Sequence, residues 1–161
     1  MTAVTIRPAR PADEASLGRH GGALMRQHHA FDPRRFILSE HPESGYGRFL
    51  VSKLDDPDAV VLVAERDGEV IGYAYAGLEP MSWKELRAAC GFVHDVYVDP
   101  RARRGGAGEQ LMRAAIGWLE AKGVPRVMLW SAAGNVAAQR LFERLGFRHT
   151  MVEMTREAGT R

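Results

Sequence analysis

The stretch Val96–Gly123, VYVDPRARRGGAGEQLMRAAIGWLEAKG, joins a predicted strand, a glycine-rich turn and a predicted helix. Valine and tyrosine favour the strand, and Pro100 ends it because proline cannot continue a sheet. Leu111 and Leu119 lie on one helical face, and Gly123 is a typical residue after a last helical turn. The turn between strand and helix holds three arginines and three glycines within eight residues.

A turn of this composition is suited to binding phosphate. The first backbone N–H groups of a helix have no acceptor within the helix, and the helix dipole favours an anion there. Glycines allow a close backbone approach and positive φ angles, while arginines add charged donors. The turn Arg103–Gly108 lacks the Gly-Lys-Ser/Thr ending of a P-loop, and its glycine spacing differs from that of a dinucleotide-binding loop.

Around this stretch the pattern predicts an α/β protein. A hairpin is expected where two apolar runs flank Asp67-Gly68, a strong two-residue turn signal. The pair Gly21–Gly22 is expected to weaken the first helix or break it in two. Helices and strands on one chain of 161 residues predict a single domain, 1–161, with helices on the faces of a mixed sheet. Strands are predicted at 4–9, 59–66, 69–78, 91–100, 125–132 and 147–157, and helices at 11–29, 46–54, 108–123 and 135–146.

Composition narrows the function classes. Hydrophobic residues make up 45% and charged residues 26%, with a net charge of +2, which is too small to suggest nucleic acid. No apolar run approaches the about 18 residues of a membrane span, and the N-terminus has no signal-peptide pattern, so no membrane partner and a cytoplasmic location are expected. The single cysteine, Cys90, and histidines without zinc-type helical spacing predict no metal site.

Two motifs resemble those of a known family. The string V-x-P-x-x-R-x-x-G-x-G, Val98–Gly108, resembles the coenzyme A pyrophosphate loop of the GNAT superfamily of N-acetyltransferases. Asn135–Phe147, NVAAQRLFERLGF, resembles the family's second motif. The resemblance implies an α/β (α+β) fold with a mixed, mostly antiparallel sheet of about six to seven strands, flanked by about four helices and splayed between strands 4 and 5. It also makes a homodimer an expectation, since dimers are common in the family.

The resemblance implies acetyl-CoA as co-substrate. Amides of the turn would bind the pyrophosphate, strand 4 would pair with the pantetheine arm, and an N–H of Val96 or Tyr97 would stabilise the oxyanion. Asn135 would face the coenzyme, although it is equally well explained as a helix N-cap. The predicted coenzyme-binding residues are Val96, Tyr97, Val98, Arg103, Arg104, Gly105, Gly106, Ala107, Gly108, Asn135 and Phe142.

Phe142 stands where many relatives have a tyrosine that acts as general acid. A thiol has a pKa of only about 8.5, so its thiolate can leave without that acid. Alternatively Tyr97 or Ser131 donates the proton, or the chain binds coenzyme A and turns over poorly. Core packing beside Ala138 is a structural explanation of Phe142 that needs no catalytic role.

The acceptor amine must lose a proton, because an alkylammonium has a pKa of about 10.4. The predicted catalytic residues are Asp95, Tyr97, His94 and Glu79, and a water chain is the alternative base. Strand alternation predicts Asp95 and Tyr97 on one face of the sheet, with His94 and Val96 on the other.

The sequence therefore predicts an acetyl-CoA-dependent N-acetyltransferase that acetylates a primary amine of a small molecule by direct attack in a ternary complex. A protein N-terminal or lysine acetyltransferase is the first alternative. A low-activity, coenzyme A-binding regulatory module, suggested by Phe142, is the second.

Overall fold

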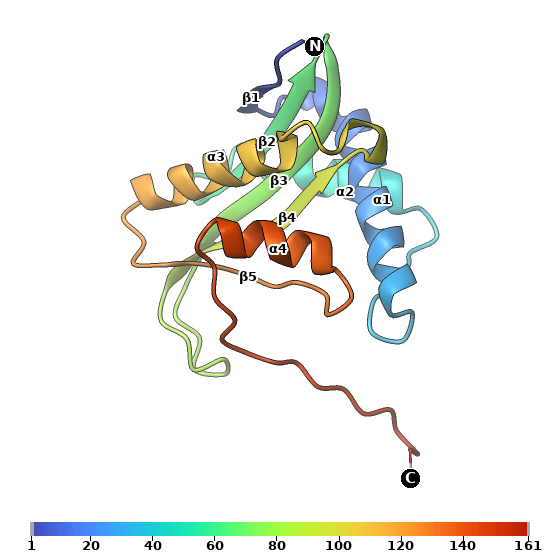
Figure 1. The fold of residues 1–161 in the computed structure, drawn as a ribbon, viewed down its shortest axis with the longest axis vertical. Helices are drawn as coiled ribbons and strands as arrows, with labels where there is room; N and C mark the ends of the chain where they lie inside the picture. Colours follow the sequence, from blue (N-terminus) through green and yellow to red (C-terminus); the bar gives the residue numbers. More distant parts are fainter. Residues whose placement is uncertain (1, 161) are drawn as a thin grey trace.

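The structure is a computed structural model that describes residues 2–160. Within this range it contains a five-stranded sheet and four α-helices (Figure 1). Two short 3-10 turns, Pro11–Asp13 and Pro100–Ala102, precede the first and the third α-helix. The elements follow in the order β1 (Thr5–Pro8), α1 (Glu14–Phe31), α2 (Pro42–Val51), β2 (Ala59–Arg66), β3 (Glu69–Glu79), β4 (Cys90–Val98), α3 (Ala107–Ala121), β5 (Val127–Leu129) and α4 (Val136–Arg144).

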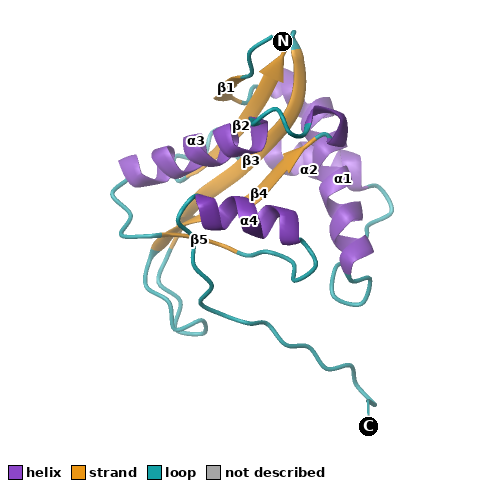
Figure 2. Ribbon diagram, viewed as in Figure 1, coloured by secondary structure: helices purple, strands orange, loops and turns teal. Residues whose placement is uncertain are grey.

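The strands lie side by side in chain order, β1-β2-β3-β4-β5 (Figure 2). Neighbours from β1 to β4 are antiparallel, whereas β5 runs parallel to β4. The predicted hairpin between β2 and β3 is confirmed. Asp67 and Gly68 have φ angles of 54° and 78°, the two positive values that a type I′ turn requires.

Helices cover both faces of the sheet. Alternate residues of β2 show the division, because Leu62 packs under α3 and α4, while Val63 packs under α1 and α2. Leu111 of α3 is fully buried in the first of these cores, and Leu17 of α1 is fully buried in the second. The mixed sheet with four flanking helices agrees with the fold predicted from the sequence.

The glycines of α1 serve helix packing and do not interrupt the helix. A Cβ on Gly18 would lie 2.5 Å from the Glu43 carbonyl oxygen of α2, and one on Gly47 would lie 2.9 Å from the Glu14 carbonyl oxygen of α1. The predicted break at Gly21–Gly22 is wrong: α1 continues through both residues, which are buried against α2. Their lack of side chains lets the two helices approach closely, and this contact stabilises a helix with a low intrinsic propensity.

The sheet has five strands in the described residues, fewer than the six to seven that were predicted. Residues 147–157 were expected to form a last strand, but they are extended and mostly exposed, and they pair with no strand of the described chain. Gly146, with a φ of 92°, ends α4 and turns the chain away from the sheet, and Arg35 pairs with Glu153. The apolar residues of this segment are those of a strand, but a strand also needs a partner for its backbone groups.

Candidate functional site

The sheet opens between β4 and β5. The two strands pair only at three positions, ending at Val93 and Leu129, while β4 continues to Val98. Asp99 donates its N–H to the Ile71 carbonyl of β3 at 2.8 Å. Because successive residues of a strand point their backbone groups to opposite sides, Val96 and Val98 direct theirs toward the space that β5 leaves. The predicted splay is therefore present and exposes the edge of β4.

The turn Arg103–Gly108 lies at the end of this open edge. Gly106 has a φ of 78° and precedes α3, and Arg104 has a φ of 70°. The first helical bond runs from the Gln110 N–H to the Gly106 carbonyl at 3.0 Å, so the N–H groups of Ala107, Gly108 and Glu109 have no acceptor within α3. The helix N-terminus with unpaired N–H groups is present, and the binding of an anion there stays a prediction.

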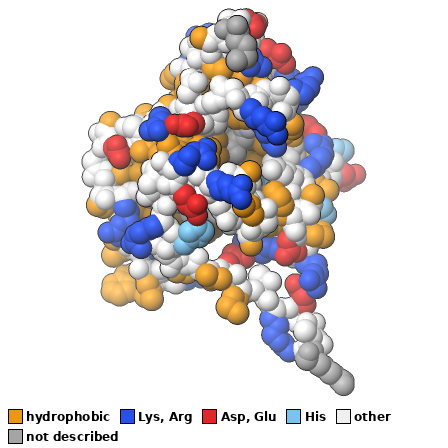
Figure 3. Space-filling model, viewed as in Figure 1, with side chains coloured by type: hydrophobic (Ala, Val, Ile, Leu, Met, Phe, Trp, Pro, Cys, Tyr) orange, Lys and Arg blue, Asp and Glu red, His pale blue; other side chains and the backbone are white. Residues whose placement is uncertain are grey.

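Packing within the chain does not explain the small residues of the turn. A Cβ on Gly105, Gly106 or Gly108 would meet no atom of the protein closer than 3.6 Å. Only the positive φ of Gly106 requires glycine for a reason of backbone geometry. The bare backbone thus leaves space in front of α3, where Figure 3 shows a hollow with Lys and Arg side chains beside it.

The two arginines of the turn are placed differently. Arg103 donates from Nε to the Val98 carbonyl oxygen at 2.9 Å, and its guanidinium carbon lies 5.5 Å from the centre of the Tyr97 ring. These contacts brace the turn against the end of β4. Arg104 is exposed, and no hydrogen bond of its side chain is found among the described residues. Arg104 is therefore the turn arginine available to an anion.

Asn135 and Phe142, the two predicted coenzyme ligands of α4, both have structural roles. Asn135 Oδ1 accepts a hydrogen bond from the Ala138 N–H at 3.3 Å, which is an N-cap. Phe142 is 7% exposed and belongs to the core under α3 and α4, with its ring 6.1 Å from that of Phe147. Their contacts with a coenzyme remain predictions.

A β-bulge at His94 changes the arrangement of the predicted catalytic residues. Tyr75 of β3 pairs with Asp95, and the next residue, Ala76, pairs with Val93, so His94 is an extra residue in β4. The rings of Tyr75 and Phe92 stack on His94 at centroid distances of 4.9 Å each. The prediction that His94 and Asp95 lie on opposite faces is wrong, because the extra residue places both on the face covered by α1 and α2.

Asp95 is a carboxylate in an apolar environment. Tyr73 donates its hydroxyl to Asp95 Oδ2 at 3.0 Å from the neighbouring strand. Burial raises the pKa of Asp95 from its ordinary value of 3.8 to about 6, and the Tyr73 hydroxyl opposes that rise. Burial also raises the pKa of Tyr73 well above its ordinary value, so Tyr73 remains the donor at neutral pH.

His94 and Glu79 form a second pair at the open end of the sheet. His94 Nε2 lies 3.0 Å from Glu79 Oε1, and the His94 side chain is 29% exposed. Burial lowers the pKa of His94 below 6.5, against the opposing effect of the Glu79 carboxylate. The ring is therefore mainly neutral at pH 7. If Nε2 donates to Glu79, the lone pair of the neutral ring is on Nδ1.

Sequence reasoning missed two residues at this site. Tyr73 was not considered, although the hairpin register and strand alternation place it on the face of Asp95. His20 of α1 was read only as part of a helix, but it is buried, its ring lies 5.9 Å from Tyr97, and Nδ1 has no hydrogen-bond partner among residues 2–160. Nothing in a single sequence indicates that α1 turns this residue toward β4.

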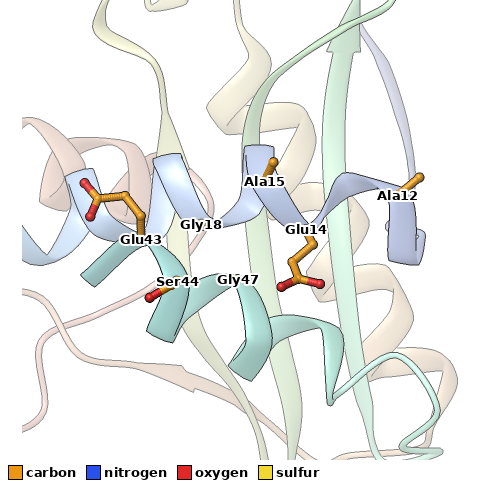
Figure 4. A pocket seen from close by; sticks show the side chains of 7 residues that line it. All are labelled: Ala12, Glu14, Ala15, Gly18, Glu43, Ser44 and Gly47. Carbon is orange, nitrogen blue, oxygen red and sulfur yellow. The ribbon is translucent and has the colours of Figure 1, made fainter. Parts of the chain in front are cut away.

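A surface pocket lies elsewhere, between the first two helices. It is an open groove of about 510 Å³ between α1 and α2, with Glu14 and Glu43 toward opposite ends (Figure 4). None of the predicted site residues line it. A smaller pocket of about 270 Å³ includes Tyr46 and Phe49 of α2. The small residues that draw α1 and α2 together account for the first groove, so its size does not make it the candidate site.

Two structural features are absent from residues 2–160. No group of three or more His, Cys, Asp or Glu side chains in this range could hold a metal ion. No helix in the same range has both the length and the apolar character needed to cross a membrane.

Comparison with known proteins identifies the family. The model of the acetyltransferase (GNAT) family matches residues 23–147. A mycothiol acetyltransferase from Acidothermus cellulolyticus is 33% identical over 81% of this chain, which spans only 43% of that relative. A solved tetramutant protein from Bacillus halodurans has a TM-score of 0.80 at 23% identity, with 95% of this chain and 99% of that chain covered. The aminoglycoside N-acetyltransferase AAC(6')-Iy in complex with CoA has a TM-score of 0.70 at 19% identity, with 99% and 97% covered. The chain therefore belongs to the acetyltransferase (GNAT) family.

Proposed function

We propose that this protein is an acetyl-CoA-dependent N-acetyltransferase that acetylates the primary amine of a small molecule. The observation that carries the proposal is the open edge of β4, which ends at the N-terminus of α3. An extended ligand with a diphosphate at one end matches this arrangement. Acetyl-CoA is such a ligand, and a structural neighbour is described in complex with CoA.

In the proposed complex, different groups of the protein bind the diphosphate, the pantetheine arm and the thioester of acetyl-CoA. The diphosphate accepts hydrogen bonds from the N–H groups of Ala107, Gly108 and Glu109, with Arg104 adding positive charge. The pantetheine amides pair with the backbone of Val96 and Val98, as a strand would. The Val96 N–H faces the open edge, so it is the backbone donor proposed for the oxyanion, in preference to that of Tyr97.

Acetyl transfer then follows by direct attack. The neutral amine nitrogen forms a bond to the thioester carbon, the carbon–sulfur bond breaks, and coenzyme A leaves as a thiolate. The proton that the amine loses goes to His94, which is neutral and more accessible than Asp95. Asp95 is held by the hydrogen bond from Tyr73 and is not the proposed base.

A covalent enzyme intermediate is not part of this mechanism. Cys90 is 1% exposed, and its sulfur lies 3.3 Å from Arg87 Nη1 at the start of β4. A buried thiol of this kind is poorly placed to attack a thioester. Phe142 offers no proton to the leaving thiolate, but a thiolate is a weaker base than the attacking amine and can leave without protonation.

A small-molecule acceptor is favoured over a protein. The relative and the structural neighbour described above are named for mycothiol and for aminoglycosides, which are small molecules. Small amines therefore come first in the test, and peptides with free N-termini or lysines form a second set that examines the alternative.

The coenzyme site is tested by two glycine substitutions at opposite ends of one helix. Gly106 and Gly123 have φ angles of 78° and 79°, and a Cβ on either would meet little or nothing of the protein. Valine therefore imposes similar backbone strain at both positions. Gly106→Val should weaken acetyl-CoA binding in calorimetry by at least about tenfold, while Gly123→Val should not. Equal effects of the two substitutions on binding would remove the turn from the proposal.

The chemical step is tested by thiol release from acetyl-CoA. His94→Gln should lower kcat by about 100-fold without changing the dissociation constant of acetyl-CoA, because a general base contributes at least this factor. Asp95→Asn should retain kcat within about tenfold. Tight acetyl-CoA binding with no thiol release for any amine or peptide would refute the transferase and favour the regulatory module.

A further inference from the structure

A continuous row of aromatic rings crosses the proposed acceptor side of the site. Each ring contacts the next, with centroid distances from 4.9 to 6.5 Å. The row begins on α2, crosses β3 and β4, and ends directly after β5. We call the following six residues the aromatic row: Tyr46, Phe49, Tyr75, His94, Phe92 and Trp130.

Exposure varies along the row. Phe92 is 5% exposed, whereas Phe49 is 43% exposed and Trp130 is 71% exposed. Trp130 follows the last residue of β5, at the point where β5 leaves β4, and its ring meets that of Phe92 edge to face at 5.3 Å. Large exposed aromatic residues next to a site are characteristic of ligand-binding surfaces.

The charges near the row suit one cationic group. Glu79 is bonded to His94 at the middle of the row. Asp95 is already bonded to Tyr73, and the ammonium of Lys53 lies 5.4 Å from the centre of the Phe49 ring at the far end. An amine before proton loss is attracted by one carboxylate and by ring faces. A polyamine or an amino sugar would require more carboxylates or hydrogen-bonding groups than the aromatic row supplies.

We propose that the acceptor is a primary amine that carries an aromatic ring, with its amino group at His94 and Glu79 and its ring packed on Trp130. This inference rests on the proposed acetyltransferase function and specifies its substrate class. In this arrangement the amino group and the ring of the acceptor both lie on the face covered by α1 and α2. The acceptor therefore reaches the thioester from the side opposite α3 and α4. The amine is then beside the nitrogen base that takes its proton, and the ring is beside the divergence of β4 and β5.

The substrate class is tested by comparing four amines in the thiol-release assay with acetyl-CoA. The amines are phenethylamine, hexylamine, putrescine and glucosamine. We expect phenethylamine to have the highest kcat/KM, by about three- to tenfold over hexylamine, because an aromatic pair is stabilised beyond the apolar area that it buries. A higher kcat/KM for putrescine or glucosamine than for phenethylamine would overturn the inference.

A pair of tryptophan substitutions locates the ring. Trp130→Ala should raise KM for phenethylamine by about tenfold and leave KM for hexylamine within about threefold. Trp83→Ala is the matched control, since Trp83 is 82% exposed and contacts no other ring in the described structure. Both side chains are largely exposed, so neither variant should lose its fold, and circular dichroism checks this. Equal KM values for phenethylamine in the two variants would remove Trp130 from the acceptor site.

The two levels of proposal fail in different ways. If acetyl-CoA does not bind, or no amine releases thiol, the proposed function itself is wrong. If acetyl-CoA binds and other amines are acetylated while phenethylamine is not, the function stands and the aromatic substrate class is wrong. If phenethylamine is the best acceptor and Trp130→Ala alone raises its KM, both are supported.

Discussion

Replacing Asp95 with asparagine should stabilise the protein at neutral pH. The carboxylate is half-buried on the face covered by α1 and α2, and its hydrogen-bond partner is the Tyr73 hydroxyl at 3.0 Å. Asparagine has nearly the same shape and keeps a carbonyl oxygen that can accept this hydrogen bond. The substitution therefore removes the buried charge and preserves most of the packing.

The pKa of Asp95 sets the size and the pH range of the effect. Burial raises this pKa to about 6 in the folded state, compared with 3.8 for an ordinary aspartate. The folded state therefore binds the Asp95 proton more tightly than the unfolded state does. The stabilisation that results from this proton binding is fully present below pH 3.8. It is lost as the pH rises through about 6. A pKa difference of about two corresponds to at most about 3 kcal/mol at pH 7, since remaining exposure reduces it.

Urea unfolding at two pH values isolates this contribution from the other effects of the substitution. The advantage of Asp95→Asn over the wild type should grow by about 2 kcal/mol between pH 4.5 and pH 7. Asp58→Asn is the matched control, because Asp58 is exposed and removing it changes the net charge equally. Comparison of the two variants at each pH cancels the general effect of one lost negative charge.

The opposite dependence would contradict the reasoning. If the advantage of Asp95→Asn shrank between pH 4.5 and pH 7, Asp95 would stabilise the folded protein as a carboxylate, and its folded pKa would lie below 3.8. An advantage independent of pH would mean that solvent reaches the carboxylate freely. Either result would also remove the argument that Asp95 is held away from the acceptor amine.

Three further substitutions test the packing around the site. Tyr73→Phe removes the donor of Asp95 and should lower the free energy of unfolding by about 1.5 to 3 kcal/mol at pH 7, with a smaller loss at pH 4.5, measured by urea unfolding. Gly18→Ala should cost about 1 to 3 kcal/mol by thermal unfolding, because its Cβ would press on the backbone of α2, while Gly45→Ala has open space and should not destabilise. Asn135→Ala should cost about 1 kcal/mol in the same measurement, since it removes the N-cap of α4.

The sequence was sufficient for most of the fold because local signals agree with long-range packing. Asp67-Gly68 predicts the hairpin, and the spacing of Leu111 and Leu119 predicts α3, whose apolar face is buried as expected. The failures occur where tertiary contacts decide. Gly21–Gly22 has a low helix propensity, but its contact with α2 outweighs that preference. Residues 147–157 have strand-forming side chains, but strand formation also depends on a partner elsewhere in the chain.

The candidate site was predictable only in part. The turn Arg103–Gly108 could be singled out because phosphate binding by a backbone requires particular residue types at particular positions. The side-chain arrangement was not found, because alternation along a strand assumes that no residue is inserted. No residue type in β4 indicates a bulge at His94. The bulge changes the face of the sheet that is expected for every residue on one side of it. The pairing of Tyr73 with Asp95 likewise depends on the register between two strands.

The bulge at His94 also connects the two halves of the proposed site. An extra residue increases the local twist of a strand, and here it follows directly after Val93, the last residue of β4 that pairs with β5. The same irregularity therefore accounts for the end of the β4–β5 pairing, which exposes the Val96 and Val98 edge, and for the position of His94 beside Asp95. Removing it by deleting His94 should restore alternation, extend the pairing with β5 and abolish acetyl-CoA binding together with catalysis. Loss of catalysis with normal acetyl-CoA binding would show that the bulge serves His94 alone.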